Sequence, residues 1–211
     1  MNKDIPEVTV KDNETRILRA AEAEFMTKGF AGARTNSIAE AAGVTHAMLH
    51  YYFRTKEKLF ERIVDDKVAM LRRSLLVPAL ESDLPLPELI RVIISQHLDF
   101  IAANPMLPRF IIGEIYNNTE RAAGFVEKIR TYAPLMLASL QAKIDAAVAA
   151  DECRQTDARM LMLDIASLNI FSFMATPVVN AALGSLTEDH DAFVAMRKAE
   201  NYDTIMRKLR P

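Results

Sequence analysis

The stretch that most constrains the fold runs from Thr35 to Leu59, where two short segments with apolar patterning flank a glycine. Gly43 supplies a turn conformation that a residue with a side chain resists. At about 100° per residue, Leu49 and Phe53 point to the same side of the second segment, so Tyr51 points away from them. This spacing predicts a helix-turn-helix. Its two apolar faces consist of Ile38, Ala39, Ala42, Val44, Leu49 and Phe53.

Periodicity alone leaves two interpretations open, because glycine-joined helix pairs also occur in all-helical proteins that bind no nucleic acid. Bulk charge does not decide between them. The formal net charge of the 211 residues is −2, and the first 60 carry nine Lys or Arg against eight Asp or Glu. Any DNA contact must therefore come from placed groups rather than from a basic surface.

The motifs around this stretch are more specific. The segment ILRAAEAEFMTKGFAGARTNSIAEAAGV ends its first helix in a Gly-aromatic pair and contains I-A-x-x-A-G-V, and LHYYFRTKEKLF adds Y-F and then K-x-x-L. From about Thr15 to Leu59 the chain thus resembles the DNA-binding domain of the TetR family of bacterial transcriptional regulators. The resemblance implies an all-α fold with an N-terminal three-helix helix-turn-helix domain and a larger helical ligand-binding and dimerisation domain. We place these domains at 1–60, with 1–12 as a flexible arm, and at 61–211.

Three threonines stand where helix caps are expected. Thr35, Thr45 and Thr55 each precede a predicted helix, and a hydroxyl there can accept from free backbone N–H groups. Lys56 in a first helical turn opposes the helix dipole, which a bound phosphate would explain, although a solvated lysine offset by Glu57 is the simpler interpretation. The resemblance implies that Thr35, Tyr51 and Lys56 contact phosphates, that Asn36 reaches a base edge, and that the positions after Thr45 select the operator. The candidate DNA-binding residues are Arg34, Thr35, Asn36, Thr45, His46, Ala47, Met48, His50, Tyr51 and Lys56.

Two histidines in the predicted recognition helix need separate treatment. His50 stands where the family commonly has a phosphate-contacting tyrosine, so the operator sequence is not predictable. His46 and His50 are spaced i, i+4, which also suits a metal ion, but no third ligand is near in sequence, and we expect no metal and no cofactor. Protonation of either imidazole beside a phosphate predicts tighter DNA binding at mildly acidic pH.

The rest of the chain is patterned as long helices. We expect helices over 13–28, ended by Gly29, over 56–78, 89–103, 106–117, 119–150 with an interruption at Pro134, 157–183 and 188–209. From Ile165 to Leu186 there is no charge, but Asn169, Pro177 and other polar residues interrupt the run, which favours a buried helix over a membrane span. The single Cys153 and the polar N-terminus fit a cytoplasmic protein without a signal peptide.

The last two helices carry apolar residues on more than one face, which predicts partners inside and outside the subunit. In the family, the final helices of two subunits pair into a four-helix interface, and a dimer presents two recognition helices about one DNA turn apart. The candidate interface residues are Leu161, Ile165, Leu168, Val178, Phe193, Tyr202, Ile205 and Leu209. If the resemblance extends to effector binding, the candidate pocket residues are His97, Phe100, Met106, Arg109, Phe110, Glu114, Met136 and Phe173. Met and Phe at helical spacing are also ordinary core residues.

The leading hypothesis is a homodimeric repressor that leaves a palindromic double-stranded operator when a small hydrophobic ligand binds. The alternative is an architectural or partner-controlled DNA-binding protein of the same fold without a small-molecule effector. We expect no enzymatic activity, because the sequence has no nucleophile elbow, no Gly-rich phosphate loop and no convincing metal set.

Overall fold

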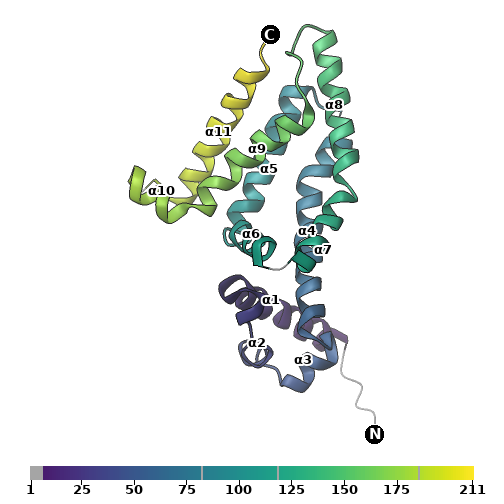
Figure 1. Cartoon of the computed structure of the whole chain (residues 1–211), viewed down its shortest axis with the longest axis vertical. Helices are drawn as coiled ribbons and strands as arrows, with labels where there is room; N and C mark the ends of the chain where they lie inside the picture. The colour runs from purple at the N-terminus through teal and green to yellow at the C-terminus, as the bar shows by residue number, and fades with distance from the viewer. Residues whose placement is uncertain (1–6, 82, 118, 185) are drawn as a thin grey trace. The chain divides into compact units, whose positions relative to one another are not determined.

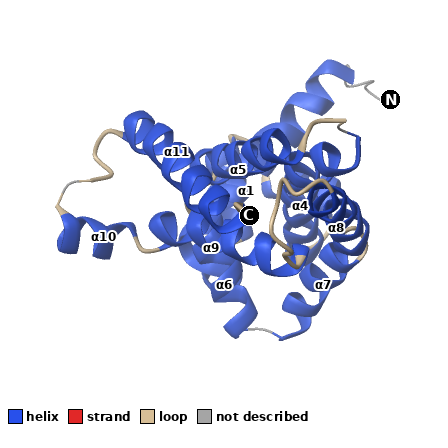
Figure 2. Cartoon of the chain, turned by 90° about the horizontal axis from the view of Figure 1, so that it is seen from above, coloured by secondary structure: helices blue, strands red, loops and turns tan. Residues whose placement is uncertain are grey.

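The computed structural model describes residues 7–81, 83–117, 119–184 and 186–211, and these residues form eleven α-helices and no strand (Figures 1 and 2). The all-α prediction is therefore confirmed. The helices are α1 (Glu7–Gly32), α2 (Thr35–Ala42), α3 (His46–Phe53), α4 (Lys56–Glu81), α5 (Leu86–Ala103), α6 (Leu107–Asn117), α7 (Thr119–Arg130), α8 (Ala133–Ala149), α9 (Ala158–Met174), α10 (Thr176–Leu183) and α11 (His190–Leu209).

The chain divides into two compact units. The first consists of Met1–Lys67 and Phe110–Ala122, and the second of Val68–Arg109 and Ala123–Pro211. The sequence placed a boundary at residue 60 and assigned everything after it to one domain. In the structure the first unit extends further along α4 and also takes in a segment from the middle of the chain. One reason that this later segment belongs to the first unit is the contact of Phe110 with Phe60, whose ring centroids lie 5.7 Å apart.

The core of the first unit is built on α1. Ile17, Ala21 and Phe25 are fully buried, as are Ile38 of α2 and Leu49 of α3. Two ion pairs join α4 to the outer side of α1: Arg62 Nη1 lies 3.2 Å from Glu14 Oε1, and Lys67 Nζ lies 2.7 Å from Glu22 Oε1. Burial of one apolar stripe per helix is what makes helices this short stable.

The N-terminal helix starts earlier than its pattern indicates. Because α1 begins at Glu7, the arm predicted over 1–12 is wrong for residues 7–12, while residues 1–6 lie outside the described part of the chain. The predicted break at Gly29 is present, with φ 67° and ψ 174°, but one further helical turn follows it. The positive φ requires glycine at this position.

Prolines interrupt the later helices only in part. The predicted interruption near Pro134 is present, since α7 ends at Arg130 and α8 starts at Ala133. By contrast, α4 continues through Pro78 to Glu81. The predicted helix over 157–183 is two helices, α9 and α10, because the Thr176 hydroxyl caps the end of α9 by donating to Ser172 O and Phe173 O, and Pro177 starts the next helix.

Helices α5, α9 and α11 pack against one another in the second unit (Figure 1). Their inward faces are apolar, with Leu89, Ile94 and Leu98 of α5 at 0–1% exposure. No single helix of the described residues is long and apolar enough to cross a membrane. Among the described helices, α9 and α10 together reach that length and hydropathy, but they are bent by 80° with respect to each other.

Candidate nucleic-acid interface

The turn between α2 and α3 is closed by backbone hydrogen bonds and by one arginine. Gly43 adopts φ 64° and ψ 37°, and its N–H donates to Glu40 O while Val44 N–H donates to Ala39 O. Arg16 of α1 donates from Nη2 to Gly43 O at 3.2 Å. A Cβ at position 43 would clash with Arg16 Nη2, so glycine permits both the left-handed backbone and the arginine contact.

Two of the three predicted threonine caps are confirmed. Met48 N–H donates to Thr45 Oγ1 and Lys58 N–H donates to Thr55 Oγ1, each at 3.2 Å. The prediction for Thr35 is wrong, because the N-cap of α2 is Arg34, which makes no side-chain cap. The Thr35 hydroxyl instead lies 3.0 Å from Nε2 of His46, which ties the N-terminus of α2 to that of α3.

Helix α3 has a buried apolar face and an exposed face, as its sequence pattern predicts. Leu49 and Phe53 are 0% and 7% exposed, whereas Tyr51 is 79% exposed. The predicted DNA-binding residues occupy the outer face of α3 and the N-terminal ends of α2 and α4, all within the first unit. Arg34, Asn36, Thr45, His46, Ala47, His50 and Tyr51 are exposed, and Thr35, Met48 and Lys56 are half-buried.

The two histidines of α3 contact each other edge to face, with ring centroids 4.5 Å apart and ring planes at 76°. His50 Nδ1 lies 2.7 Å from Arg54 O. A carbonyl oxygen can only accept, so this nitrogen carries the proton and the neutral ring presents Nε2 as an acceptor. Within the described residues no three His, Cys, Asp or Glu side chains are grouped for a metal ion.

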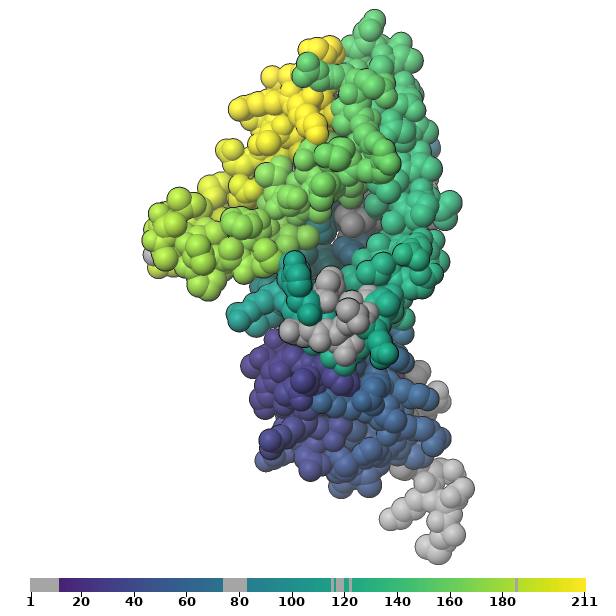
Figure 3. Space-filling view, in the orientation of Figure 1, coloured from purple at the N-terminus to yellow at the C-terminus, as the bar shows by residue number. Residues whose placement is uncertain are grey.

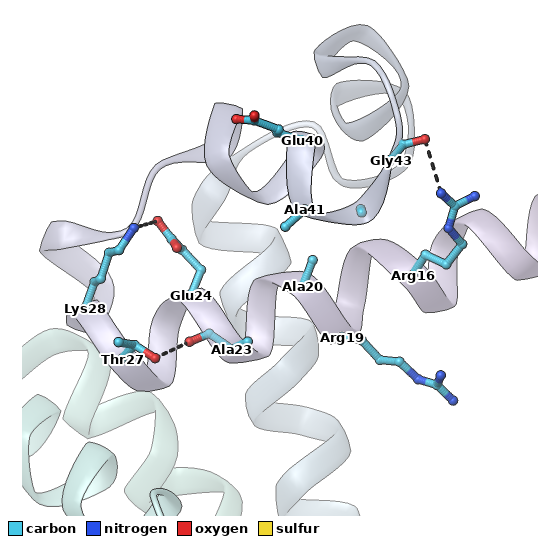
Figure 4. Close-up of a pocket in the computed structure, with 11 residues that line it drawn as sticks. Arg16, Arg19, Ala20, Ala23, Glu24, Thr27, Lys28, Glu40, Ala41 and Gly43 are labelled. Atoms are coloured by element: carbon cyan, nitrogen blue, oxygen red, sulfur yellow. Dashed lines mark hydrogen bonds and ion pairs between the residues drawn. The ribbon is translucent and has the colours of Figure 1, made fainter.

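An open groove of about 650 Å³ lies between α1 and α2 (Figure 4). Its floor consists of alanines, and its rim carries charges of both signs. Glu24 Oε1 accepts from Lys28 Nζ at 2.9 Å and from Arg34 N at 3.3 Å. The hydrogen bond from Lys28 lowers the pKa of Glu24, and the bond from Arg34 acts in the same direction. Glu24 thus supports the start of α2, which lacks a side-chain cap of its own.

Lys56 has a neighbourhood that the sequence pattern did not reveal. Its Nζ lies 4.6 Å from the ring centroid of Phe30, and the guanidinium of Arg121 lies 4.1 Å from the same ring. Glu114 Oε1 accepts from Phe30 N, and its Oε2 accepts from Arg121 Nε. The sequence pattern identifies the Gly29-Phe30 pair at the end of the first helix. It does not indicate that Phe30 contacts Glu114 or Arg121, because these residues lie 84 or more positions later in the chain.

The eight predicted pocket residues are divided between the two units. Glu114 is bonded to Phe30 and Arg121, and Phe110 packs on Phe60, and both lie in the first unit. Met106 and Arg109 are exposed. The four other residues, His97, Phe100, Met136 and Phe173, are buried in the second unit.

The interface prediction is wrong for five of its eight residues. Their side chains are 0–3% exposed because they form the core of their own subunit, so they are not available to a second copy: Leu161, Ile165, Phe193, Ile205 and Leu209. Of the others, Leu168 is half-buried, Val178 is 66% exposed, and the Tyr202 ring is covered by Arg91, whose Cζ lies 3.7 Å from its centroid. The large apolar side chains exposed on α9, α10 and α11 are those of Met160, Leu163, Phe171, Val178, Leu183 and Met196.

A buried polar chain crosses the core of the second unit. Asn169 Nδ2 donates to Ile94 O and lies 3.2 Å from Nδ1 of His97, while its Oδ1 accepts from Asn201 Nδ2 at 2.7 Å. Since an amide nitrogen can only donate, His97 accepts at Nδ1 and carries its proton on Nε2. Burial lowers the pKa of His97 to about 4, so the ring is neutral near pH 7.

Sequence comparison gives a family match for the first unit. Residues 17–63 match the family described as bacterial regulatory proteins, tetR family. An HTH-type transcriptional repressor of Streptomyces coelicolor is 35% identical over 109 residues, covering 52% of this chain and 50% of that protein. An uncharacterized HTH-type transcriptional regulator of Bacillus subtilis is 35% identical over 69 residues, covering 31% of this chain and 35% of that protein. The chain therefore spans half or less of the length of these curated relatives.

Solved structures extend the likeness to nearly the whole chain. The TetR family transcriptional regulator PfmR from Thermus thermophilus has a TM-score of 0.67 at 20% identity, covering 93% of this chain and 100% of that one. A TetR/AcrR family regulator from Thermobifida fusca has a TM-score of 0.61 at 20% identity, covering 91% and 97%. At this level of identity the likeness establishes the fold of both units.

Proposed function

We propose that this chain, whose residues 17–63 match the tetR family of bacterial regulatory proteins, is a transcriptional repressor that binds a palindromic operator as a homodimer in the bacterial cytoplasm. The observation that carries the proposal is the outer face of α3. Tyr51 is 79% exposed, and His46 and Ala47 of the same helix are also exposed. The inner face of α3, with Leu49 and Phe53, is buried. A short, rigidly backed helix with a free outer face fits a major groove.

The roles follow from the chemistry of each position. Arg34, Thr35 and Lys56, at the N-terminal ends of α2 and α4, supply donors for phosphate oxygens, as does Tyr51 on the outer face of α3. Thr45 caps the start of α3. Asn36 and His46 reach base edges. Ala47 and Met48 offer apolar contacts to thymine methyl groups, and His50 presents an acceptor in its neutral form.

Dimerisation uses the exposed apolar face of α9, α10 and α11, which we define by Met160, Leu163, Phe171, Val178, Leu183 and Met196. Figure 3 shows the three helices on one side of the second unit. No charged residue occurs between Ile165 and Thr187, as expected for the core of an interface between subunits. A second copy brings a second α3 to the operator, which a helix of eight residues needs for tight binding.

The effector is a small hydrophobic molecule held in the second unit near His97, Phe100, Met136 and Phe173. These side chains come from three helices and combine aromatic and thioether surfaces with one neutral imidazole. The Nε2–H of His97 is the hydrogen-bond donor that this environment offers to a ligand carbonyl or hydroxyl.

Selection of bound sequences from a pool of random DNA duplexes tests the regulator. We expect a palindrome whose half-sites are centred about one helical turn apart. Exchange of Ala47 or Met48 for serine should change the preferred bases at one position of each half-site, whereas Ala149→Ser, at an exposed site of α8, should leave the palindrome unchanged. A pool that shows no enrichment would refute operator binding.

A further inference from the structure

Two cationic side chains converge on the ring of Phe30 in the first unit. Lys56 Nζ and Arg121 Cζ lie 4.6 and 4.1 Å from its centroid. A cation within about 6 Å of an aromatic face is attracted by the ring quadrupole. Phe30 is itself held in place, since its centroid lies 5.1 Å from that of Phe60 and 5.9 Å from that of Phe25. The ring is therefore a fixed platform for both cations.

Glu114 balances one of these charges. Its Oε2 accepts from Arg121 Nε at 2.8 Å, and its Oε1 accepts from Phe30 N at 3.2 Å. The Glu114 side chain is 14% exposed and that of Arg121 is 26% exposed, so solvent screens the pair only in part. If Arg121 lost its charge, an uncompensated carboxylate would remain close to the ring that holds Lys56.

We propose that Phe30, Arg121 and Glu114 are positioning residues that hold the Lys56 ammonium at the start of α4, ready for a DNA backbone phosphate; this rests on the proposed function. The ring fixes the position of the ammonium without neutralising it. The Arg121–Glu114 pair keeps the carboxylate from drawing Lys56 away from the phosphate. Both members of the pair come from Phe110–Ala122, a segment that the second unit flanks in sequence on both sides.

Through Lys56, the segment Phe110–Ala122 should affect DNA affinity in a way that can be measured. Phosphate contacts by lysine contribute a term that depends on salt and not on base sequence. Loss of Arg121 should therefore weaken binding to any duplex, and it should do so only while Lys56 is present. A residue that merely stabilised the fold would weaken binding whichever residue stood at position 56.

The experiment measures binding to a fluorescein-labelled random-sequence duplex of about 30 base pairs, long enough for both half-sites, over a range of salt concentrations. Lys56→Met should reduce the slope of the logarithm of the binding constant against the logarithm of the salt concentration by about 1 for each bound lysine. This slope is called the salt slope below. Arg121→Met should weaken binding about threefold to tenfold, comparable to the loss of one partly buried cation contact. Arg121→Lys and the double variant Arg121→Met/Glu114→Gln should bind as the unaltered protein does.

The decisive comparison adds Arg121→Met to a Lys56→Met background, where it should have no further effect. Equal weakening in both backgrounds would overturn the positioning role. A Lys56→Met protein that keeps the original affinity and salt slope would also overturn it, while leaving operator binding intact. Thermal unfolding of each variant accompanies the titrations, and only an effect on DNA affinity beyond any loss of folded protein supports the proposal. Failure of the unaltered protein to bind any duplex at low salt would instead reject the proposed function itself.

Discussion

Asn201 of α11 donates a 2.7 Å hydrogen bond to the side-chain oxygen of Asn169 of α9, and both amides are completely enclosed by the second unit. Asn169 also donates to Ile94 O of α5, so one amide connects three helices. A buried network of this kind is stabilising only while every member has a partner, and removal of one partner exposes the desolvation penalty of the others.

Asn169→Ala should therefore destabilise the protein by about 2–4 kcal/mol, because it leaves Asn201, His97 and Ile94 O without their partner. Urea unfolding followed by circular dichroism gives the free energy of unfolding. Gln96→Ala, at an exposed site of α5, is the matched control and should change stability by less than about 0.5 kcal/mol. If both variants unfold at the same urea concentration, the network contributes nothing.

Burial of His97 makes stability depend on pH. Its pKa in the folded protein is about 4, below the ordinary value of about 6.5 that it regains on unfolding. Between these values the unfolded state binds more protons, so stability is complete above pH 6.5 and falls as the pH is lowered towards 4. From pH 7 to pH 5 we expect a loss of up to about 2 kcal/mol. In His97→Gln this part of the pH dependence should disappear, and an unchanged pH profile would show that the imidazole does not resist protonation.

Two glycine-to-alanine substitutions should change the folding stability in opposite directions. Gly43→Ala should destabilise the first unit by about 1–2 kcal/mol, because φ is +64° and the added Cβ would displace the Arg16 guanidinium from Gly43 O. Gly124→Ala lies within α7 with open space around it, and should stabilise the protein by about 0.5–1 kcal/mol. Thermal unfolding compares the two. A stabilising Gly43→Ala would contradict the left-handed turn.

The dimer should depend on outer-face residues and not on the core residues of the same helix. Phe171→Glu and Leu163→Glu place a charge on surfaces that are 60% and 57% exposed, and should give folded monomers. Ile165→Glu places a charge at a site that is 1% exposed, and should cost about 3–5 kcal/mol of folding stability. Sedimentation equilibrium with circular dichroism separates the outcomes. Dimers that persist in both outer-face variants would exclude this surface as the interface.

Features that depend on residues close together in the sequence, such as helix caps and helix faces, could be predicted. Thr45 and Thr55 cap helices through residues three positions away, and Leu49 and Phe53 share a face through helical spacing alone. Thr35 was misassigned as a cap because its hydroxyl has a competing partner in His46, on another helix. Periodicity also shows that Ile165 lies on an apolar face, but it does not tell whether its own subunit or a second copy covers that face.

The residues that the sequence did not reveal depend on contacts distant in the chain. Glu114 reads equally well as a pocket lining or a solvated carboxylate until Phe30 N, 84 positions earlier, is brought to its Oε1. Asn169 and Asn201 look like ordinary interruptions of apolar helices, and only the packing of α9 on α11 makes them partners. Pairings of this kind become visible only when the tertiary fold is known.

The two histidines of α3 should contribute to DNA affinity. Both imidazoles are exposed on α3, where their ring nitrogens can form hydrogen bonds with base edges or phosphate oxygens. The double variant His46→Ala/His50→Ala should therefore bind the random-sequence duplex about threefold to tenfold more weakly at constant salt. His190→Ala, which changes an exposed histidine of the second unit, should bind as the unaltered protein does. Unchanged affinity of the double variant would exclude both histidines from the DNA-binding surface.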